Sequence, residues 1–332
     1  MSANLDLSVD SYRGSRALVL GASGFVGQWV VRALEERGAR TVAAVRDAGD
    51  GASLLATLGT EVQVVEFDLG RLEEIPDFLG HVRPAIVFNL AGYGIDPSER
   101  DEELAYLINA ELVAALGESI AQVRSEEWTG QALVHVGSAA EYGTVGGNLA
   151  EGSRGQPLGL YGASKLAGTQ KLRERAARSG LRALTARLFT LYGLGEHPGR
   201  LLPSLLEAAR RDRSLDLTAG RQLRDFTYVE DVAEGLLRLG ASEAEPGEVV
   251  NLATGRLTSV RRFAETAGSL LGMPEAHLRF GSLSTRPDEM RHDPVTVARL
   301  KELVSWAPPS TIEDGIRRTI ELTAEAPPRN TG

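Results

Sequence analysis

Short apolar runs alternate with longer amphipathic segments along the first half of the chain. The first run, at 17–20, is followed by Val26, Val30 and Leu34, which recur at the spacing of one helical face until Gly38. Further runs of strand length lie at 41–45, 62–67, 85–90, 132–136 and 183–188. Helices are predicted between them at 72–79, 102–123 and 161–178. Because buried strands alternate with amphipathic helices, the pattern predicts an α/β domain with a doubly wound parallel sheet.

The regular alternation ends after Leu188. Glycines and a proline between Gly193 and Gly199 indicate a loop, and the segments beyond it no longer follow the strand–helix rhythm. One later strand-like run, at 249–252, is expected to return to the main sheet. We therefore predict a large domain and a smaller α/β C-terminal lobe that is partly discontinuous. The predicted bounds are an irregular tail at 1–15, the large domain at 16–190 with a returning segment at about 226–253, and the lobe at 191–225 and 254–326.

The composition is that of an ordinary folded protein. Of the 332 residues, 42% are hydrophobic and 24% charged, and the net charge of −9 argues against a nucleic-acid partner. The sequence has no run of about 18 apolar residues, which a membrane-spanning helix needs. We therefore expect no membrane partner and a cytoplasmic protein. The absence of cysteine excludes disulfides and thiol catalysis, and the five histidines are not at metal-ligand spacing, so no metal is expected.

A glycine-rich turn with the spacing G-x-x-G-x-x-G joins the first predicted strand to the first helix. Glycines allow a tight turn and a close backbone approach, and the N–H groups that begin the helix favour a bound pyrophosphate. In this strand–turn–helix setting the motif predicts a Rossmann-type site for a nicotinamide dinucleotide. The residues expected to contact the dinucleotide at the turn are Gly21, Ser23, Gly24, Phe25, Val26 and Gly27.

The end of the second predicted strand distinguishes the two forms of the dinucleotide. NAD sites place a carboxylate there for the ribose 2′-hydroxyl, whereas NADP sites place an arginine for the 2′-phosphate. Arg46 occupies this position and favours NADP(H). Asp47 is adjacent, and a shift of one residue in the strand end would favour NAD(H), so NAD(H) stays possible.

A tyrosine and a lysine four residues apart lie in the helix predicted at 161–178. Tyr161 and Lys165 share one helical face, so the ammonium can act on the phenol. A nearby cation in a dry site would lower the pKa of the tyrosine from its ordinary value of about 10. Ser138, just beyond the strand predicted at 132–136, places a hydroxyl at the carboxyl edge of the sheet, where substrates approach.

These motifs resemble those of the extended short-chain dehydrogenase/reductases that act on nucleotide sugars. Ser138-Ala-Ala-Glu-Tyr142-Gly143 matches the family's serine or threonine four residues before a Tyr-Gly pair. Arg224-Asp-Phe-Thr-Tyr-Val-Glu-Asp231-Val-Ala resembles the R-D-[FY]-x-[YH]-V-x-D-V-A segment of nucleotide-sugar epimerases, dehydratases and reductases. The resemblance covers nearly the whole chain and implies a nucleotide-diphosphate sugar as the substrate.

The resemblance also implies roles for particular residues, and a homodimer formed through the helices at 102–123 and 161–178. The implied catalytic residues are Ser138, Tyr161 and Lys165. Besides the glycine turn and Arg46, the implied cofactor contacts are Asp68, Leu69, Leu90, Ala91, Gly92, Asn109, Tyr161, Lys165 and Leu188. The implied substrate contacts are Ser138, Thr190, Arg200, Arg224 and Arg286, with Thr190 in a position where relatives have asparagine.

Positions at which this sequence differs from the family's pattern argue against some of the family's reactions. The 4,6-dehydratases carry a carboxylate where this chain has Ala140, which argues against dehydration in that manner. The combined epimerase/reductases of the family use a cysteine, which the chain lacks. Arg46 then favours NADPH-dependent reduction of the C4 keto group of a nucleotide-activated (deoxy)hexose, with Tyr161 as the proton donor. Two alternatives stay open: an NDP-sugar 4-epimerase with tightly bound NAD, and a non-catalytic NADP-sensing protein on the same fold.

Overall fold

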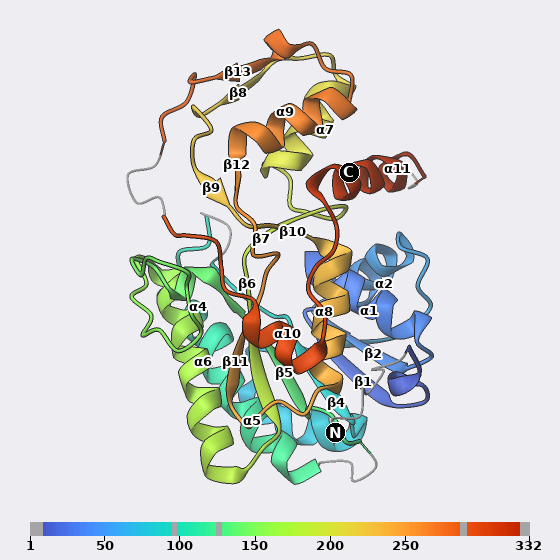
Figure 1. Ribbon diagram of the computed structural model, residues 1–332. Coiled ribbons are helices and arrows are strands. Elements are labelled where there is room, and N and C mark those ends of the chain that lie inside the picture. The colour runs from blue at the N-terminus through green and yellow to red at the C-terminus, as the bar shows by residue number, and fades with distance from the viewer. Residues whose placement is uncertain (1–8, 95–97, 124–127, 286–290, 326–332) are drawn as a thin grey trace.

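A parallel β-sheet forms the centre of the larger domain (Figure 1). The computed structural model describes residues 9–94, 98–123, 128–285 and 291–325. Within them, seven strands lie in the order β11-β6-β5-β4-β1-β2-β3, and every neighbouring pair is parallel. The strands are β1 (Arg16–Leu20), β2 (Arg40–Val45), β3 (Gln63–Glu66), β4 (Ile86–Asn89), β5 (Leu133–Ser138), β6 (Ala183–Leu188) and β11 (Glu248–Leu252). The predicted doubly wound parallel fold is confirmed.

Helices cover both faces of this sheet (Figure 1). One face carries α1 (Phe25–Glu36), α2 (Ala48–Ala56) and α8 (Val229–Ala241), and the other carries α3 (Ile75–Val82), α5 (Leu112–Val123) and α6 (Leu160–Ser179). Side chains of β1 alternate between the two hydrophobic cores, with Ala17 and Val19 in the first and Leu18 and Leu20 in the second. Both faces of the strands are therefore buried, which explains their continuous apolar runs.

The helix predicted at 102–123 is continuous but changes its winding. It starts as α4 (Glu102–Tyr106), passes through π-helical turns at Leu107–Glu111 and ends as α5. By length and composition this segment could cross a membrane, with a mean hydropathy of 1.4 over its most apolar window. Half of that window is buried inside the protein, and a core helix of a globular domain meets the same criterion. α5 packs against α3 and α6, so the segment is a core helix of the sheet domain.

The N-terminal segment differs from the predicted irregular tail at residues 9–12. Val9–Tyr12 forms a 3-10 helix, and Tyr12 is 2% exposed. Its ring lies beside Trp128, and its hydroxyl donates a hydrogen bond of 2.6 Å to the carbonyl oxygen of Leu237 on α8. One aromatic side chain therefore fixes this segment to the larger domain, a long-range contact that local polarity does not reveal.

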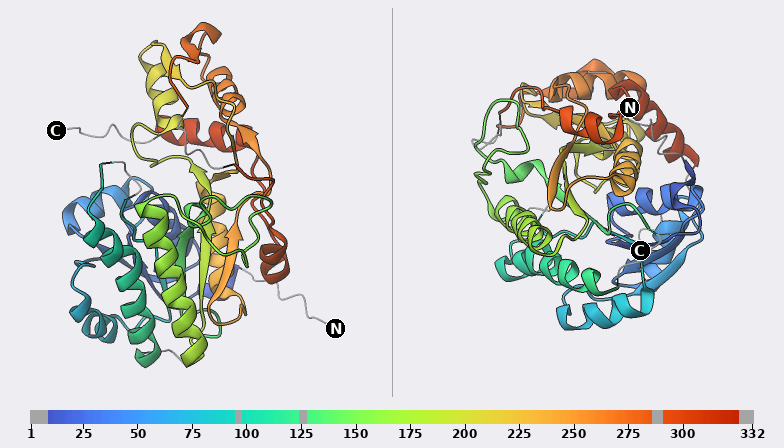
Figure 2. Two further views of the ribbon diagram at one scale, coloured as in Figure 1. Left: turned by 90° about the vertical axis from the view of Figure 1, so that its left-hand side faces the viewer. Right: turned by 60° about the horizontal axis from the view of Figure 1, so that its bottom comes forward.

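A smaller lobe stands at the carboxyl edge of the sheet, as Figure 2 shows. Its helices are α7 (Leu201–Arg210), α9 (Val260–Leu270) and α11 (Ile312–Glu325). Its strand pairs are β7 (Thr190–Tyr192) with β10 (Phe226–Tyr228), β9 (Leu223–Arg224) with β12 (Thr258–Ser259), and β8 (Leu215–Leu217) with β13 (Leu278–Phe280). The lobe is built from segments on both sides of α8 and β11, which themselves belong to the sheet layers.

Aromatic packing holds the elements of the lobe together. Phe226 of β10 stacks on Phe263 of α9 with 4.3 Å between ring centroids, and Tyr192 of β7 meets the same Phe263 ring edge-on at 5.1 Å. Beyond the lobe, α10 (Ala298–Val304) packs against β11 and α8, although the sequence pattern placed its residues in the lobe. A contact between the two parts comes from Asp231 of α8, whose carboxylate accepts the N–H of Ser310 in the segment before α11.

Candidate active site

The glycine turn lies between β1 and α1, at the carboxyl edge of the sheet. Gly21 has a φ of +72°, and a Cβ there would lie 2.9 Å from the backbone nitrogen of Ala91. A Cβ at Gly27 would lie 2.1 Å from the carbonyl oxygen of Gly21. Gly24, the N-cap of α1, offers no side-chain oxygen to the first N–H groups of the helix. The turn therefore packs backbone against backbone and leaves these N–H groups to an anion.

Arg46 directly follows β2 and is exposed. The neighbouring Asp47 is the N-cap of α2, and its Oδ1 accepts the N–H of Asp50 at 2.8 Å. This carboxylate is therefore engaged in a helix cap. Because β2 ends at Val45, Arg46 and not Asp47 occupies the position directly after the strand.

The other predicted cofactor residues gather at the same edge because each ends or follows a parallel strand. Asp68 and Leu69 follow β3, and the Asp68 carboxylate accepts the N–H of Gly70 at 2.9 Å. Leu90, Ala91 and Gly92 follow β4, and Leu188 ends β6. The structure thus brings together segments that are far apart in the sequence.

Asn109 ties the loop after β4 to α6. This buried residue lies in the π-helical turns, and its Nδ2 donates to the carbonyl oxygen of Tyr93 at 2.7 Å and to Oγ of Ser164 at 2.9 Å. Its Oδ1 accepts the N–H of Tyr93 at 3.0 Å. Because Ser164 precedes Lys165 on α6, the amide of Asn109 holds the loop after β4 against α6.

Tyr161 lies in the first turn of α6 and hydrogen-bonds Ser138 at the end of β5. Burial raises the pKa of Tyr161, and the hydrogen bond with Ser138 opposes that rise. The expectation that Lys165 lowers this pKa is wrong for the structure as it stands. Burial outweighs the other influences, and the main charges that act on the phenol are Glu141 and Arg200. The phenol is therefore protonated at neutral pH.

Lys165 is 2% exposed and lies beside the loop after β4. Burial lowers its pKa to about 8, and the Glu141 carboxylate opposes that shift, so the ammonium persists at neutral pH. Burial and the charge of Lys165 hold the pKa of His135 well below its usual value. The neutral His135 lies with its Nδ1 3.2 Å from Nδ2 of Asn89, whose Oδ1 accepts the N–H of Ala91 at 3.3 Å.

Glu141 joins the end of β5 to α6 and β6. Its Oε1 accepts the N–H of Ser138 at 2.7 Å, and its Oε2 accepts the Thr169 hydroxyl at 3.0 Å and Nε of Arg187 at 2.9 Å. The side chains of Glu141 and Arg187 are 0% and 3% exposed. Both carboxylate oxygens are therefore engaged inside the protein, so Glu141 does not replace the carboxylate that the dehydratases carry at the position of Ala140. Sequence reasoning missed it, although a charged residue three positions beyond a buried strand was a signal.

Apart from Ser138 at the end of β5, the predicted substrate residues that the structure describes lie in the lobe. The N–H of Thr190 donates to the carbonyl oxygen of Asp225 at 3.1 Å, which places β7 beside the Arg224 segment. Burial lowers the pKa of Arg224 on β9. Arg200 is the N-cap of α7, and its charge acts on the phenol of Tyr161. Arg286 lies outside the described residues.

The acidic residues of the Arg224 segment are structural. Asp225 is 1% exposed and accepts the N–H groups of Thr254 at 2.9 Å and Gly255 at 2.8 Å. Asp231 accepts the N–H of Ser310 at 3.0 Å. These carboxylates fix the loop after β11 and the segment before α11, so the motif holds the lobe together as well as supplying an arginine.

A further carboxyl that sequence reasoning missed lies in the loop after β7. Nε1 of Trp29 on α1 donates to the carbonyl oxygen of Leu194 at 2.9 Å, which holds this loop near the glycine turn. The side chain of Glu196 is 9% exposed, and burial raises its pKa to about 8 against the opposing charge of Arg200. A single glutamate in a glycine-rich loop carries no sequence signal for such burial.

Comparison with known proteins places the chain in a family. The model of the NAD dependent epimerase/dehydratase family matches residues 17–253. The chain belongs to this family. The matched region runs from β1 to β11 and includes the glycine turn, Ser138, Tyr161 and Lys165. The resemblance to extended short-chain dehydrogenase/reductases is confirmed.

Relatives of this family member cover nearly its full length. A dTDP-6-deoxy-L-talose 4-dehydrogenase (NAD(P)(+)) of Kitasatospora kifunensis is 29% identical over 328 residues, which are 94% of this chain and 97% of the relative. The structure of MoeE5 with UDP-glucuronic acid and NAD has a TM-score of 0.77 and 27% identity, and covers 94% of this chain and 99% of that one. UDP-glucose 4-epimerase of Thermotoga maritima with UDP-glucose shares the fold, with a TM-score of 0.82, 21% identity and coverage of 93% and 99%.

We predict that Gly27→Ala weakens dinucleotide binding. The added methyl group would lie 2.1 Å from the carbonyl oxygen of Gly21, so the turn must shift and its N–H groups lose their arrangement around an anion. Isothermal titration with NADPH and with NAD⁺ should show affinities at least about tenfold lower than those of the wild type. Gly80→Ala in α3 is the matched control, because no heavy atom lies within 4 Å of the added methyl. Wild-type affinity in the Gly27 variant would contradict this role of the turn.

Proposed function

We propose that the protein is an NADPH-dependent reductase of the C4 keto group of a nucleotide-activated (deoxy)hexose. The observation that carries this proposal is the half-buried phenol of Tyr161, which is hydrogen-bonded to Ser138 and protonated at neutral pH. A protonated phenol suits the donation of a proton to an alkoxide that develops at C4. The full-length relative named as a 4-dehydrogenase supports the proposal, because oxidation at C4 is the reverse of this reduction.

The residues at the carboxyl edge of the sheet fit a nicotinamide dinucleotide. Gly21 and Gly27 leave no room for side chains, and the uncapped N–H groups at the start of α1 suit a pyrophosphate. Arg46 is exposed at the end of β2 while Asp47 caps α2, which favours a 2′-phosphate and hence NADP(H). When bound, the reduced nicotinamide supplies the hydride. NAD(H) is the alternative, and MoeE5 was solved with NAD.

The catalytic side chains of this protein would hold the proton and transfer it to the substrate. Tyr161 holds a proton on its phenol oxygen and gives it to the C4 oxygen as negative charge develops there. The Ser138 hydroxyl orients the phenol and donates to the same oxygen. The Lys165 ammonium, charged at neutral pH with a pKa of about 8, stabilises the phenolate that remains.

The lobe would bind the nucleotide diphosphate. Arg224 on β9 and Arg200 at the start of α7 supply guanidinium groups, which suit bidentate contacts with phosphate oxygens. Thr190 lies next to the Arg224 segment and offers a hydroxyl where many relatives offer an amide. A nucleotide-diphosphate sugar is therefore the proposed substrate class.

The direct experiment combines cofactor analysis with a turnover assay. The purified protein is denatured to release and identify any bound dinucleotide, and it is then incubated with NADPH and a dTDP-linked 4-keto-6-deoxyhexose. The proposal predicts oxidation of one NADPH for each 4-hydroxy sugar formed. Tightly bound NAD⁺ with inversion at C4 and no net oxidation would replace the proposal by 4-epimerisation. Dinucleotide binding without turnover of any nucleotide sugar would indicate the NADP-sensing protein.

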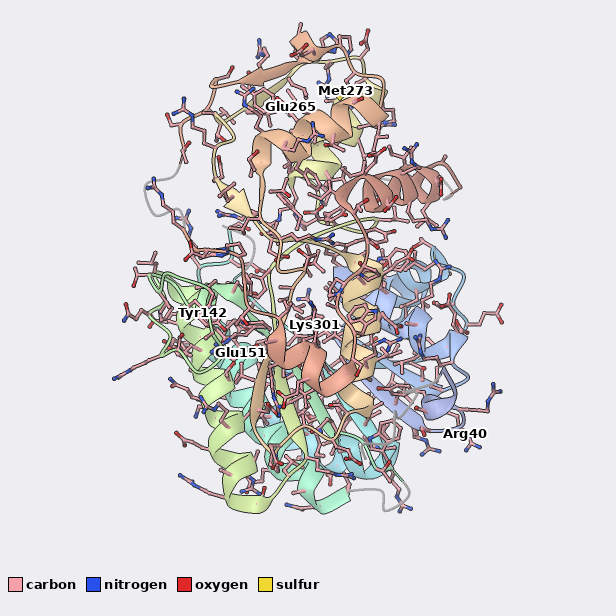
Figure 3. All side chains as sticks on the ribbon, viewed as in Figure 1. Arg40, Tyr142, Glu151, Glu265, Met273 and Lys301 are labelled. Carbon is pink, nitrogen blue, oxygen red and sulfur yellow. The ribbon has the colours of Figure 1, made fainter. Side chains whose placement is uncertain are left out.

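Arg46→Ala tests the cofactor preference. Loss of a charged contact with the 2′-phosphate should raise the KM for NADPH about tenfold to a hundredfold and leave the KM for NADH unchanged. Initial rates with the two cofactors give the comparison. Arg40→Ala is the matched control, because Arg40 is an exposed arginine at the opposite end of the same strand, far from the lobe in Figure 3. Equal changes in KM for both cofactors would contradict a 2′-phosphate contact.

A further inference from the structure

We propose that Glu141, paired with Arg187, is a positioning residue that locks Ser138 to the catalytic helix α6 and supplies the negative charge beside Tyr161 and Lys165. This inference rests on the proposed function, because it assigns the role of Glu141 in the same proton transfer.

The hydrogen bonds of Glu141 connect the two elements that carry the catalytic side chains. Its carboxylate accepts the N–H of Ser138 at 2.7 Å from the end of β5 and the hydroxyl of Thr169 at 3.0 Å from α6. Thr169 lies one helical turn beyond Lys165 and two turns beyond Tyr161, on the same face of α6. One carboxylate therefore fixes the distance between the serine and the tyrosine–lysine face.

Arg187, the ion-pair partner of Glu141, is itself held in place by neighbouring side chains. The guanidinium of Arg187 lies over the ring of Tyr142 with 4.4 Å to the centroid, and the Tyr142 hydroxyl donates to Oδ1 of Asn251 at 2.8 Å. The N–H of Asn251 donates to Glu151 at 3.2 Å, and Figure 3 shows Tyr142 and Glu151 close together beside the sheet. The ion pair is thus held from β5, β6 and β11, which leaves Glu141 little freedom to move.

The burial of this ion pair points to more than a stabilising role. Glu141 and Arg187 are 0% and 3% exposed, and desolvation of two ions offsets most of their attraction. The negative charge of Glu141 raises the pKa of both Tyr161 and Lys165. The other titratable groups that face the catalytic pair are Arg200, Glu99 and His135. Glu141 is the one charge among these named groups that acts on both members in the same direction, and it favours the protonated form of each.

Glu141→Gln tests the charge while keeping the shape of the side chain. Without the carboxylate the pKa of Tyr161 and that of Lys165 both fall, so the proton-donating phenol is lost at a lower pH. The alkaline limb of kcat for NADPH-dependent reduction should therefore move to lower pH, with the KM for NADPH unchanged. Glu234→Gln is the control, because Glu234 pairs with Arg37, the C-cap of α1, and with Arg238 on α8, away from the catalytic helix. Its pH profile should match that of the wild type.

Thr169→Val tests the link to α6 while leaving the charge of Glu141 in place. Loss of this hydrogen bond lets the helix face shift relative to Ser138, and kcat should fall about tenfold or more with the alkaline limb unmoved. Thr185→Val on β6 is the isosteric control, because the buried Thr185 hydroxyl makes no hydrogen bond within the described residues. Its kcat should equal that of the wild type.

A second variant keeps the test decisive if Glu141→Gln does not fold, since that change leaves Arg187 buried without its counter-charge. The double variant Glu141→Gln/Arg187→Met removes both charges and should show the same shift of the limb to lower pH. A folded variant with the wild-type limb and wild-type kcat would overturn the proposal. A kcat of Thr169→Val equal to that of the wild type would also overturn the proposal.

An optical titration separates failure of this inference from failure of the proposed function. Phenolate absorbance of the substrate-free protein, minus that of Tyr161→Phe, reports the ionisation of Tyr161 without any reaction. In Glu141→Gln this ionisation should occur at lower pH than in the wild type, and an unchanged titration would overturn the role of Glu141. A wild-type protein that oxidises no NADPH would instead count against the reductase itself.

Discussion

The distance between the end of β5 and the face of α6 depends on one buried carboxylate. Glu141 accepts hydrogen bonds from Ser138, Thr169 and Arg187, and both of its oxygens are used. A carboxylate buried in this way must keep its partners, since an unpaired ion inside a protein is strongly disfavoured. Ser138 and the helix that carries Tyr161 are therefore held in one relation to each other, in which the phenol hydrogen-bonds the serine.

The parallel topology then determines which other segments lie near Ser138 and Tyr161. Every strand of the sheet ends at the same edge, so the glycine turn, Arg46 and the loop after β4 converge there although they are separated in the sequence. Aromatic packing between Tyr192, Phe226 and Phe263 holds the lobe together. Asp225, which fixes the loop after β11, and Asp231 of α8, which accepts the N–H of Ser310, tie the lobe to the sheet domain. The glycine turn and Arg46 at this edge of the sheet and the lobe arginines Arg200 and Arg224 thus lie toward the same end of the molecule.

Much of this arrangement follows from the sequence, because buried parallel strands and glycine turns leave local signals. The strands, the helices at 102–123 and 161–178 and the position of Arg46 were predictable in this way. α2 was missed because its short segment contains Gly49 and Gly51 and shows weak periodicity, and the anchor of Tyr12 depends on residues more than a hundred positions away. The raised pKa of Tyr161 was predicted in the wrong direction, since burial is a property of the folded molecule.

The transfer of a labelled hydride tests the central claim most directly. NADPH with deuterium at the transferable position of the nicotinamide is incubated with the protein and a dTDP-linked 4-keto-6-deoxyhexose, and the sugar product is analysed by NMR and mass spectrometry. A reductase with Tyr161 as its proton donor predicts one deuterium at C4 of the sugar for each NADPH consumed. A product that carries no deuterium at C4, formed while the labelled NADPH is not consumed, would contradict the account.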